Sequence, residues 1–232
     1  MDLIWDGLVE AFRILGSGGR DLWAITLRSL LISGSATAIA VVVGVGVGAV
    51  LAFRRFPGRN LAVALVNTGM GLPPVVVGLV VAIFLWRSGP LGQLQLIYTP
   101  AAMVVAQSII AAPLVTGFTV AALGSLPPRL RPQLYALGAS RWQMLWLVLQ
   151  EARLPLLAAI MAGFGAAVSE VGASLMVGGN LAGETRVLTT AVVLDVQRGE
   201  FSSAIALSLI LLALIFLVNA VLTGVQQRER AS

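Results

Sequence analysis

Five long apolar runs constrain the fold of this chain more than any other feature of its sequence. They cover Thr26–Phe53, Leu61–Trp86, Pro100–Leu123, Leu154–Val177 and Phe201–Val225. Each run is long enough to cross a hydrocarbon core of about 30 Å at a helical rise of about 1.5 Å per residue. Backbone groups find no water there, so a spanning segment must be helical. The sequence therefore predicts an all-α integral membrane protein with about five transmembrane helices.

The remaining residues divide the chain into three parts. Residues 24–225 form the expected transmembrane domain, residues 226–232 a short cytoplasmic tail, and residues 1–23 an amphipathic segment. In that segment Asp2, Asp6, Glu10 and Arg13 recur at near-helical spacing, opposite an apolar face. We expect it to form a helix that lies in the membrane interface against lipid. The start lacks the basic region of a cleaved signal peptide, so we expect it to be retained.

The absence of three residue types excludes several functions. All 15 basic residues are arginine, and the sequence has no lysine, histidine or cysteine. Without lysine there is no phosphate-binding loop of the ATPase type, so this chain is not itself expected to hydrolyse ATP. Without histidine or cysteine we expect no catalytic residues, no metal site and no cofactor. The arginines do not form a basic stripe for nucleic acid.

The arginines also predict the orientation in the membrane. One set of alternate connections holds nine of them: Arg54, Arg55, Arg59, Arg129, Arg131, Arg141, Arg153, Arg228 and Arg230. The other set holds six, beside seven acids: Arg13, Arg20, Arg28, Arg87, Arg186 and Arg198. Because cytoplasmic connections carry the excess of basic residues, the first set is expected in the cytoplasm. This predicts a multi-pass protein of the cell (inner) membrane with its amino terminus outside and its carboxyl terminus in the cytoplasm.

A cytoplasmic loop of about residues 126–153 lies between the third and fourth runs. Gly138 is a natural end for a short helix begun near Pro132, because glycine accepts a left-handed conformation. Ser140 and Gln143 have the spacing of a capping box, which predicts a second helix with a stripe of Leu145, Trp146 and Leu149. The loop is therefore expected to form a rigid pair of helices exposed to the cytoplasm. A helix lying flat on lipid is the alternative.

Glycines and prolines within the runs predict how the spans pack. Gly44 and Gly48 form a GxxxG pair, a face that another helix can approach closely, either in this chain or in a second subunit. Pro73, Pro74 and Pro113 are expected to kink the second and third spans.

The loop resembles the "EAA" loop of ABC importer permeases. The resemblance rests on Gly138-Ala139-Ser140 followed by Trp142 and apolar residues, although Pro132-Gln133-Leu134 replaces the family's acidic-Ala-Ala triplet. In that family the loop docks into a groove of the ATP-binding subunit. The resemblance implies that the contact residues here are Leu134, Tyr135, Leu137, Gly138, Ala139, Ser140, Arg141 and Trp142.

The segment Gly163–Phe201 is similar to permeases for tetrahedral oxyanions. Its Ser-Glu-Val-Gly-Ala-Ser and Gly-Gly-Asn motifs most resemble the tungstate permease branch. The resemblance implies the transmembrane fold of a type I ABC importer, a homodimer of this subunit, two ATP-binding subunits that hold ATP and magnesium, and an extracytoplasmic oxyanion-binding protein. A molybdate or sulfate permease of the same architecture is the alternative. A proton-coupled secondary transporter is more remote, because it needs several titratable groups in the membrane and usually inverted repeats.

Polar residues in this segment are candidates for a gate or a path: Ser169, Glu170, Gly172, Ser174, Gly178, Gly179 and Asn180. Glu170 is the only acid well inside an apolar run, and such a residue is a functional candidate because its burial is costly. Alternatively it caps or cross-links helix ends, for example by pairing with Arg186 or Arg198. The others either offer neutral donors along a path or let helices pack closely. Because no fixed cation lies within the spans, we expect selectivity to reside in a separate binding protein.

Overall fold

The computed structural model describes residues 2–17 and 20–231, in which the chain forms eleven α-helices and one short 3₁₀-helix, η1. The elements are α1 (Asp2–Ser17), α2 (Arg20–Phe53), α3 (Arg59–Met70), α4 (Pro74–Leu85), η1 (Gly92–Leu94), α5 (Pro100–Gly124), α6 (Leu130–Ala136), α7 (Arg141–Glu151), α8 (Arg153–Val168), α9 (Gly172–Gly178), α10 (Leu188–Arg198) and α11 (Phe201–Ala231). These described residues contain no strand, and the all-α prediction is confirmed.

Among the described residues, three helices contain a segment that is long and apolar enough to span a membrane: α2, α5 and α11. Two further pairs of helices pass the same test only together, with a bend between their members of 102° for α3 and α4 and of 73° for α7 and α8. The described residues thus hold three spanning helices, or up to five if each bent pair counts as one span. The larger count equals the predicted number of about five spans, but it joins α7 with α8, whereas the predicted fourth run, Leu154–Val177, covers α8 and α9 and leaves α7 in the loop.

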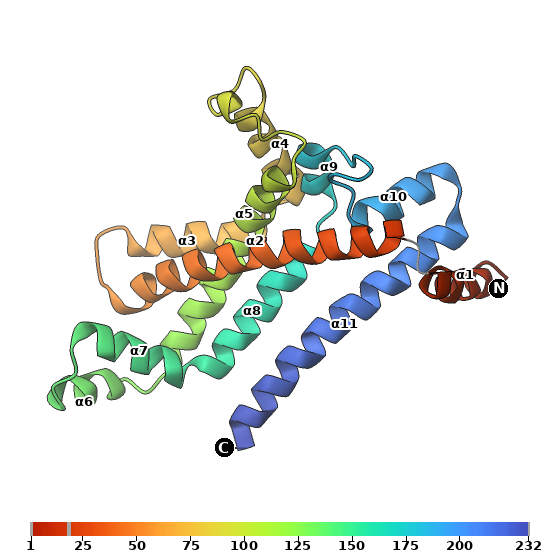
Figure 1. The fold of residues 1–232 in the computed structure, drawn as a ribbon. Coiled ribbons are helices and arrows are strands. Elements are labelled where there is room, and N and C mark those ends of the chain that lie inside the picture. The colour runs from red at the N-terminus through yellow and green to blue at the C-terminus, as the bar shows by residue number, and fades with distance from the viewer. Residues whose placement is uncertain (1, 18–19, 232) are drawn as a thin grey trace.

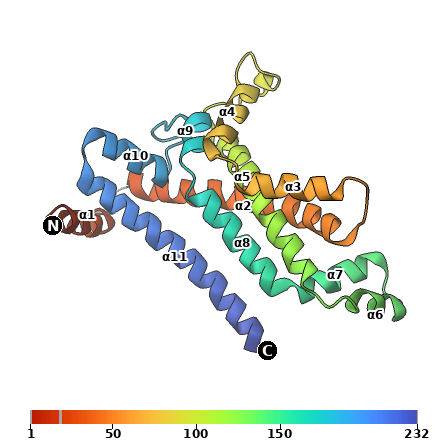
Figure 2. The same ribbon diagram turned by 180° about the vertical axis from the view of Figure 1, so that it is seen from behind.

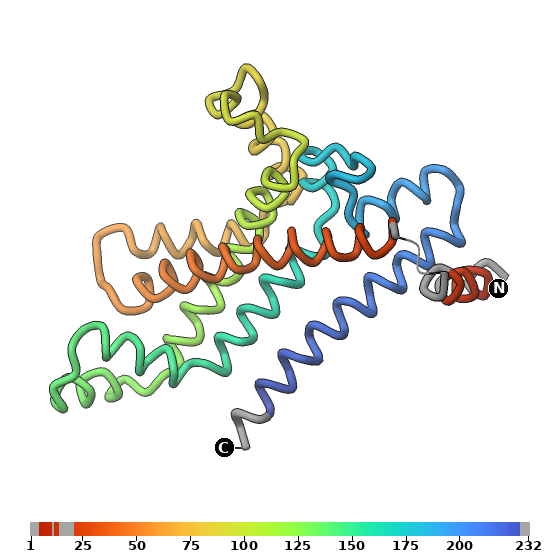
Figure 3. The backbone as a smooth tube through the Cα atoms, in the orientation of Figure 1, coloured from red at the N-terminus to blue at the C-terminus, as the bar shows by residue number. Residues whose placement is uncertain are grey.

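The long helices carry the chain between two ends of the molecule (Figures 1 and 2). One end holds the α2–α3 turn, α6, α7 and the described end of α11. The other holds α1, the η1 segment, α9 and α10. The two groups match the two sets of connections into which the arginines divide the sequence, so each predicted set does lie at one end. Figure 3 follows the backbone through these crossings.

One of the four buried apolar clusters in the described residues forms where α2, α5 and α8 cross. Ala40, Ala111, Val115 and Ala159 are buried together there. Gly44 and Gly48 face α5: a Cβ atom at Gly44 would lie 2.8 Å from Val115, and one at Gly48 would lie 2.6 Å from Thr119. The GxxxG pair therefore serves packing within this chain, which decides between the two possibilities that the sequence left open.

Two predicted spans are broken rather than continuous. The run Leu61–Trp86 stops at Met70 and resumes at Pro74, because Pro73 and Pro74 have no N–H to continue the helical ladder. The run Leu154–Val177 stops at Val168 and resumes at Gly172. The kink predicted at Pro73 and Pro74 is confirmed as a bend of 102° between α3 and α4, whereas the prediction of one continuous helix across Leu154–Val177 was wrong. By contrast, α5 continues through Pro113.

The first and last helices pack on each other, with Gly7 of α1 directly against Ile205 of α11. The sequence predicted α1 as an amphipathic helix, and its Arg13 and Glu10 form an ion pair at 3.5 Å. Trp5 and Phe12 remain exposed on its surface. The helix thus has a protein partner in addition to the lipid contact that its sequence suggests. Helix α10 was not among the helices predicted from the sequence.

Candidate functional site

The turn between α6 and α7 is one of two candidate sites in the fold. Gly138 has a φ of +82°, the left-handed conformation that the sequence predicted for it, and an added Cβ atom would meet nothing within 4 Å. The turn is closed by the Ala139 N–H, which donates to the Leu134 carbonyl at 3.0 Å. We call residues 134–142 the docking turn, after the contact with an ATP-binding subunit that the resemblance of this loop implies.

The predicted capping box of α7 is present in full. The Gln143 backbone N–H donates to the Ser140 hydroxyl at 3.3 Å, and the Ser140 N–H donates to Gln143 Oε1 at 2.8 Å. These bonds satisfy two groups that a helix start leaves unpaired. α6 begins at Leu130, two residues before the predicted start near Pro132.

The docking turn presents large side chains to its surroundings. Leu137 is 84% exposed and Trp142 is 80% exposed. Tyr135, Arg141 and Ser140 are exposed as well, whereas Leu134 and Ala139 are half-buried and pack inward. The predicted apolar stripe of α7 needs one correction: Met144 and Val148 form its buried face, and Trp146 is 64% exposed. Trp146 instead lines a shallow hollow next to Leu137 and Gly138.

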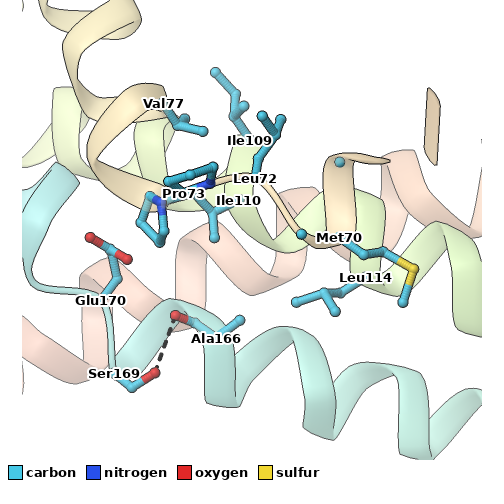
Figure 4. A pocket seen from close by; sticks show the side chains of 13 residues that line it. Met70, Leu72, Pro73, Val77, Ile109, Ile110, Leu114, Ala166, Ser169 and Glu170 are labelled. Carbon is cyan, nitrogen blue, oxygen red and sulfur yellow. Dashed lines mark hydrogen bonds between the residues drawn. The ribbon is translucent and has the colours of Figure 1, made fainter. Parts of the chain in front are cut away.

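The second candidate site is a cavity of about 460 Å³ where the two broken spans face each other (Figure 4). One wall is the α3–α4 bend, and the opposite wall is the break between α8 and α9. α5 closes the third side with Ile109, Ile110 and Leu114. The lining is apolar except for backbone groups, Ser169 and Glu170. Irregular backbone is tolerated at membrane depth where it lines such a cavity.

Glu170 is buried at the edge of this cavity, with 6% of its surface exposed. Its Oε1 accepts the Ala173 N–H at 2.6 Å and so caps the start of α9. Its backbone carbonyl accepts the Thr189 hydroxyl of α10 at 3.1 Å. In the described part of the chain it pairs with neither Arg186 nor Arg198, so the suggested ion pair was wrong. The alternative that Glu170 caps a helix end is confirmed.

The cavity takes in only two of the seven predicted path residues, Ser169 and Glu170. The other five contact neighbouring elements instead: Gly172 lies against Val75, Ser174 bonds to Gln107, Gly178 lies against Met103, Gly179 lies against Tyr98, and Asn180 donates to the Thr190 carbonyl. For these residues the structure agrees with the close-packing alternative.

Two polar contacts outside the cavity lining were not predicted from the sequence. Gln107 of α5 is 2% exposed, and its Nε2 donates to the Ser174 hydroxyl at 3.1 Å. An amide in the middle of an apolar run is the sequence signal that indicates such a contact. In a second contact, Arg28 of α2 donates to the carbonyls of Gly183 and Arg186 at 2.7 and 2.9 Å. No local pattern predicts that second contact, because the partners are far apart in sequence.

Residues 41–231 match the family described as the binding-protein-dependent transport system inner membrane component. The chain belongs to this family. It is therefore an integral membrane protein and a permease component of an ABC transporter. This confirms the family that the loop and the Gly163–Phe201 segment indicated.

Two relatives match the permease over nearly its whole length. It is 41% identical to a probable anion ABC transporter permease of Haloferax volcanii, over 90% of this chain and 91% of the relative. It is 37% identical to a tungstate uptake system permease of Peptoclostridium acidaminophilum, over 98% of this chain and 100% of the relative. Among solved structures, a methionine ABC transporter superimposes with a TM-score of 0.67 and 22% identity. The alignment covers 90% of this chain and 94% of the transporter's chain. That likeness confirms the type I importer fold.

Proposed function

We propose that this permease carries tungstate into the cell as the transmembrane subunit of an ATP-driven importer. The observation that carries the proposal is the alignment with the tungstate uptake permease of Peptoclostridium acidaminophilum, which extends over 98% of this chain. The similarity of the Ser169–Asn180 motifs to tungstate permeases supports it. A molybdate or sulfate permease of the same architecture is the second candidate.

The cavity at the broken spans is the proposed passage for the oxyanion. Its lining holds no cationic side chain. A passage that binds its ion weakly releases it readily, so selectivity belongs to a separate extracytoplasmic oxyanion-binding protein. Ser169 and Glu170 are the proposed gate residues within it, because they are the two predicted path residues that line the cavity.

The docking turn is the proposed contact with the ATP-binding subunit. Its exposed Leu137 and Trp142 extend from two short helices whose ends are fixed by Gly138 and the Ser140 capping box. A rigid, exposed apolar projection is what a partner subunit needs in order to transmit a movement. In the proposed assembly two copies of the permease form a homodimer, two ATP-binding subunits hold ATP and magnesium, and this chain itself hydrolyses nothing. In this proposal the amino terminus lies outside and the docking turn lies in the cytoplasm, which the distribution of the arginines supports.

Uptake by cells that lack this chain tests the substrate. Loss of the permease should abolish accumulation of trace tungstate, while sulfate uptake continues at the normal rate. Restoring the chain on a plasmid should recover tungstate uptake, and excess molybdate should compete more strongly than excess sulfate. Normal tungstate accumulation together with a loss of sulfate or molybdate uptake would contradict the assignment.

The Gly138→Asp variant tests the docking turn. The left-handed backbone makes any Cβ costly by about 1 kcal/mol or more, and the new side chain would also lie where the partner docks. We expect the variant to insert into the membrane but to lose transport and to co-purify poorly with the ATP-binding subunit. Gly183→Asp is a matched control, because Gly183 has a φ of +80°, is equally open and lies at the other end of the molecule. If Gly138→Asp retains its partner and transports normally, the turn is not the contact.

A further inference from the structure

Arginines from two different elements hold the end of α2 that lies near the docking turn. The guanidinium carbon of Arg131, in α6, lies 4.5 Å from the centroid of the Phe53 ring, in the last turn of α2. The Nε of Arg131 is buried and has no hydrogen-bond partner. The aromatic face is therefore a principal partner of this cation, in an arrangement that favours arginine over lysine.

The second arginine connects the same helix end to α3. Arg59, the first residue of α3, donates from Nε to the Leu51 carbonyl of α2 at 2.7 Å. The last carbonyls of a helix have no partner within it, and a cation there also interacts favourably with the helix dipole. As a result, α2 and α3 are fixed to each other at this end.

The docking turn is continuous with this junction. α6 leads directly into the turn, and both helices beside the turn share one apolar core with the ends of α2, α5 and α8, built on Ala49, Leu123, Met144, Val148 and Ala152. In the other direction, α3 leads to the bend at Gly71–Pro73, which forms a wall of the cavity. A movement of the turn thus has an uninterrupted route through packed elements: α6, the end of α2, α3 and the bend.

We propose that Arg131 and Phe53 form the joint that makes α2, and through Arg59 also α3, follow the docking turn when the ATP-binding subunit moves it. Arg131 is a positioning residue in this scheme, since it touches neither the oxyanion nor the nucleotide. The inference rests on the proposed function of the docking turn. It adds the point at which the movement enters the membrane helices.

The test measures tungstate taken up per ATP hydrolysed by the complete assembly in proteoliposomes with its binding protein. Phe53→Leu keeps an apolar side chain but removes the aromatic face, and Arg131→Gln removes the cation. Each should lower uptake per ATP about fivefold while the ATP-binding subunit co-purifies at the wild-type level. Phe53→Tyr keeps the ring and should stay within twofold of the wild type. Arg55→Gln removes an exposed arginine beside the junction and should have no effect on the ratio.

The double variant Phe53→Leu/Arg131→Gln decides whether the two residues act together. If they form one joint, the double variant should be no worse than either single variant, because the contact is already lost. Unchanged uptake per ATP in both single variants would overturn the proposal. So would losses that multiply in the double variant, or a loss of the ATP-binding subunit from Phe53→Leu, which would assign the pair to folding of the loop. If the proposed function itself is wrong, the result is a different one: the wild-type assembly will not couple ATP hydrolysis to tungstate uptake.

Discussion

Glu170 acts in this fold through its oxygen atoms. Its carboxylate accepts the Ala173 N–H at the start of α9, and its carbonyl accepts the Thr189 hydroxyl. Both bonds are buried, and both fix the break between α8 and α9 at the edge of the cavity. The charge itself has no arginine partner in the described residues. Capping and gating are therefore separable by chemistry, because a glutamine can accept the same N–H without carrying a charge.

Substitution of Glu170 should separate these two contributions. Glu170→Ala leaves the Ala173 N–H buried and unpaired, which costs about 1–3 kcal/mol of stability. Glu170→Gln retains an acceptor and should cost clearly less. Thermal unfolding in mild detergent measures both. Equal destabilisation by the two substitutions would show that the negative charge, rather than the acceptor, stabilises this break.

Residues with local signals were predicted well. Gly138 and Ser140 show their conformations in the sequence because a left-handed glycine and a capping box depend only on near neighbours. The pairing suggested for Glu170 failed because the sequence does not show which distant side chains reach it. The Arg131–Phe53 contact was invisible for the same reason, since it joins α6 to α2.

At the scale of helices, close approach decides how α2 packs on α5. Gly44 and Gly48 bring the two backbones together, while Gly46 lies on the other side of α2 with nothing within 4 Å of an added Cβ. Small residues allow this approach, and without a hydrophobic driving force in lipid the contact depends on tight packing. An added side chain is therefore expected to disturb the packing of α2 at Gly44 but to be tolerated at Gly46, two residues further on.

Gly44→Ala and Gly46→Ala form a matched pair for this contact. At Gly44 the new methyl group would lie 2.8 Å from Val115, so we expect destabilisation of about 1–3 kcal/mol from overpacking. At Gly46 the methyl group is free, and the higher helix propensity of alanine should leave stability equal or slightly higher. Thermal unfolding of the two variants tests this. Tolerance of alanine at both positions would contradict the packing described for α2 and α5.

Element lengths followed from hydropathy, but element breaks did not. Apolar runs identified α2, α5 and α11, which are each long enough to cross the membrane without interruption. Hydropathy did not reveal that helices end at Met70 and Val168. It is averaged over a window of apolar residues, so one proline pair or one glutamate changes it little. Pro73 and Glu170 stand out in the sequence, but neither residue determines the angle between the helices on the two sides of its break. That depends on the helices against which the broken pieces pack.

On the scale of the whole molecule, the connections separate into two ends (Figures 1 and 2). The end with the α2–α3 turn, α6 and α7 carries the larger set of arginines. Since all these connections lie on one side, a single measurement of sidedness fixes the orientation of the whole chain.

Reporter fusions should therefore give a consistent pattern. A reporter in the α2–α3 turn or at the carboxyl terminus should be active in the cytoplasm, and one inserted near Gly183 should be active outside. Accessibility of single cysteines at Ser140 and Ala182 is an independent check, because the natural sequence contains no cysteine. A reporter that is external at the carboxyl terminus would reverse the arrangement and remove the docking turn from the cytoplasm.

The contact between α1 and α11 can form only after the chain between these two helices has been synthesised. Gly7 is translated before Ile205, against which it lies, and about 200 residues separate the two along the chain. At about 5–20 residues per second, α1 waits on the order of 10–40 s for its partner. During that time its apolar side chains must rest on lipid or on another protein. α1 thus reaches its final position only after α11 has been made, and a chain released before α11 is complete leaves α1 without its protein partner.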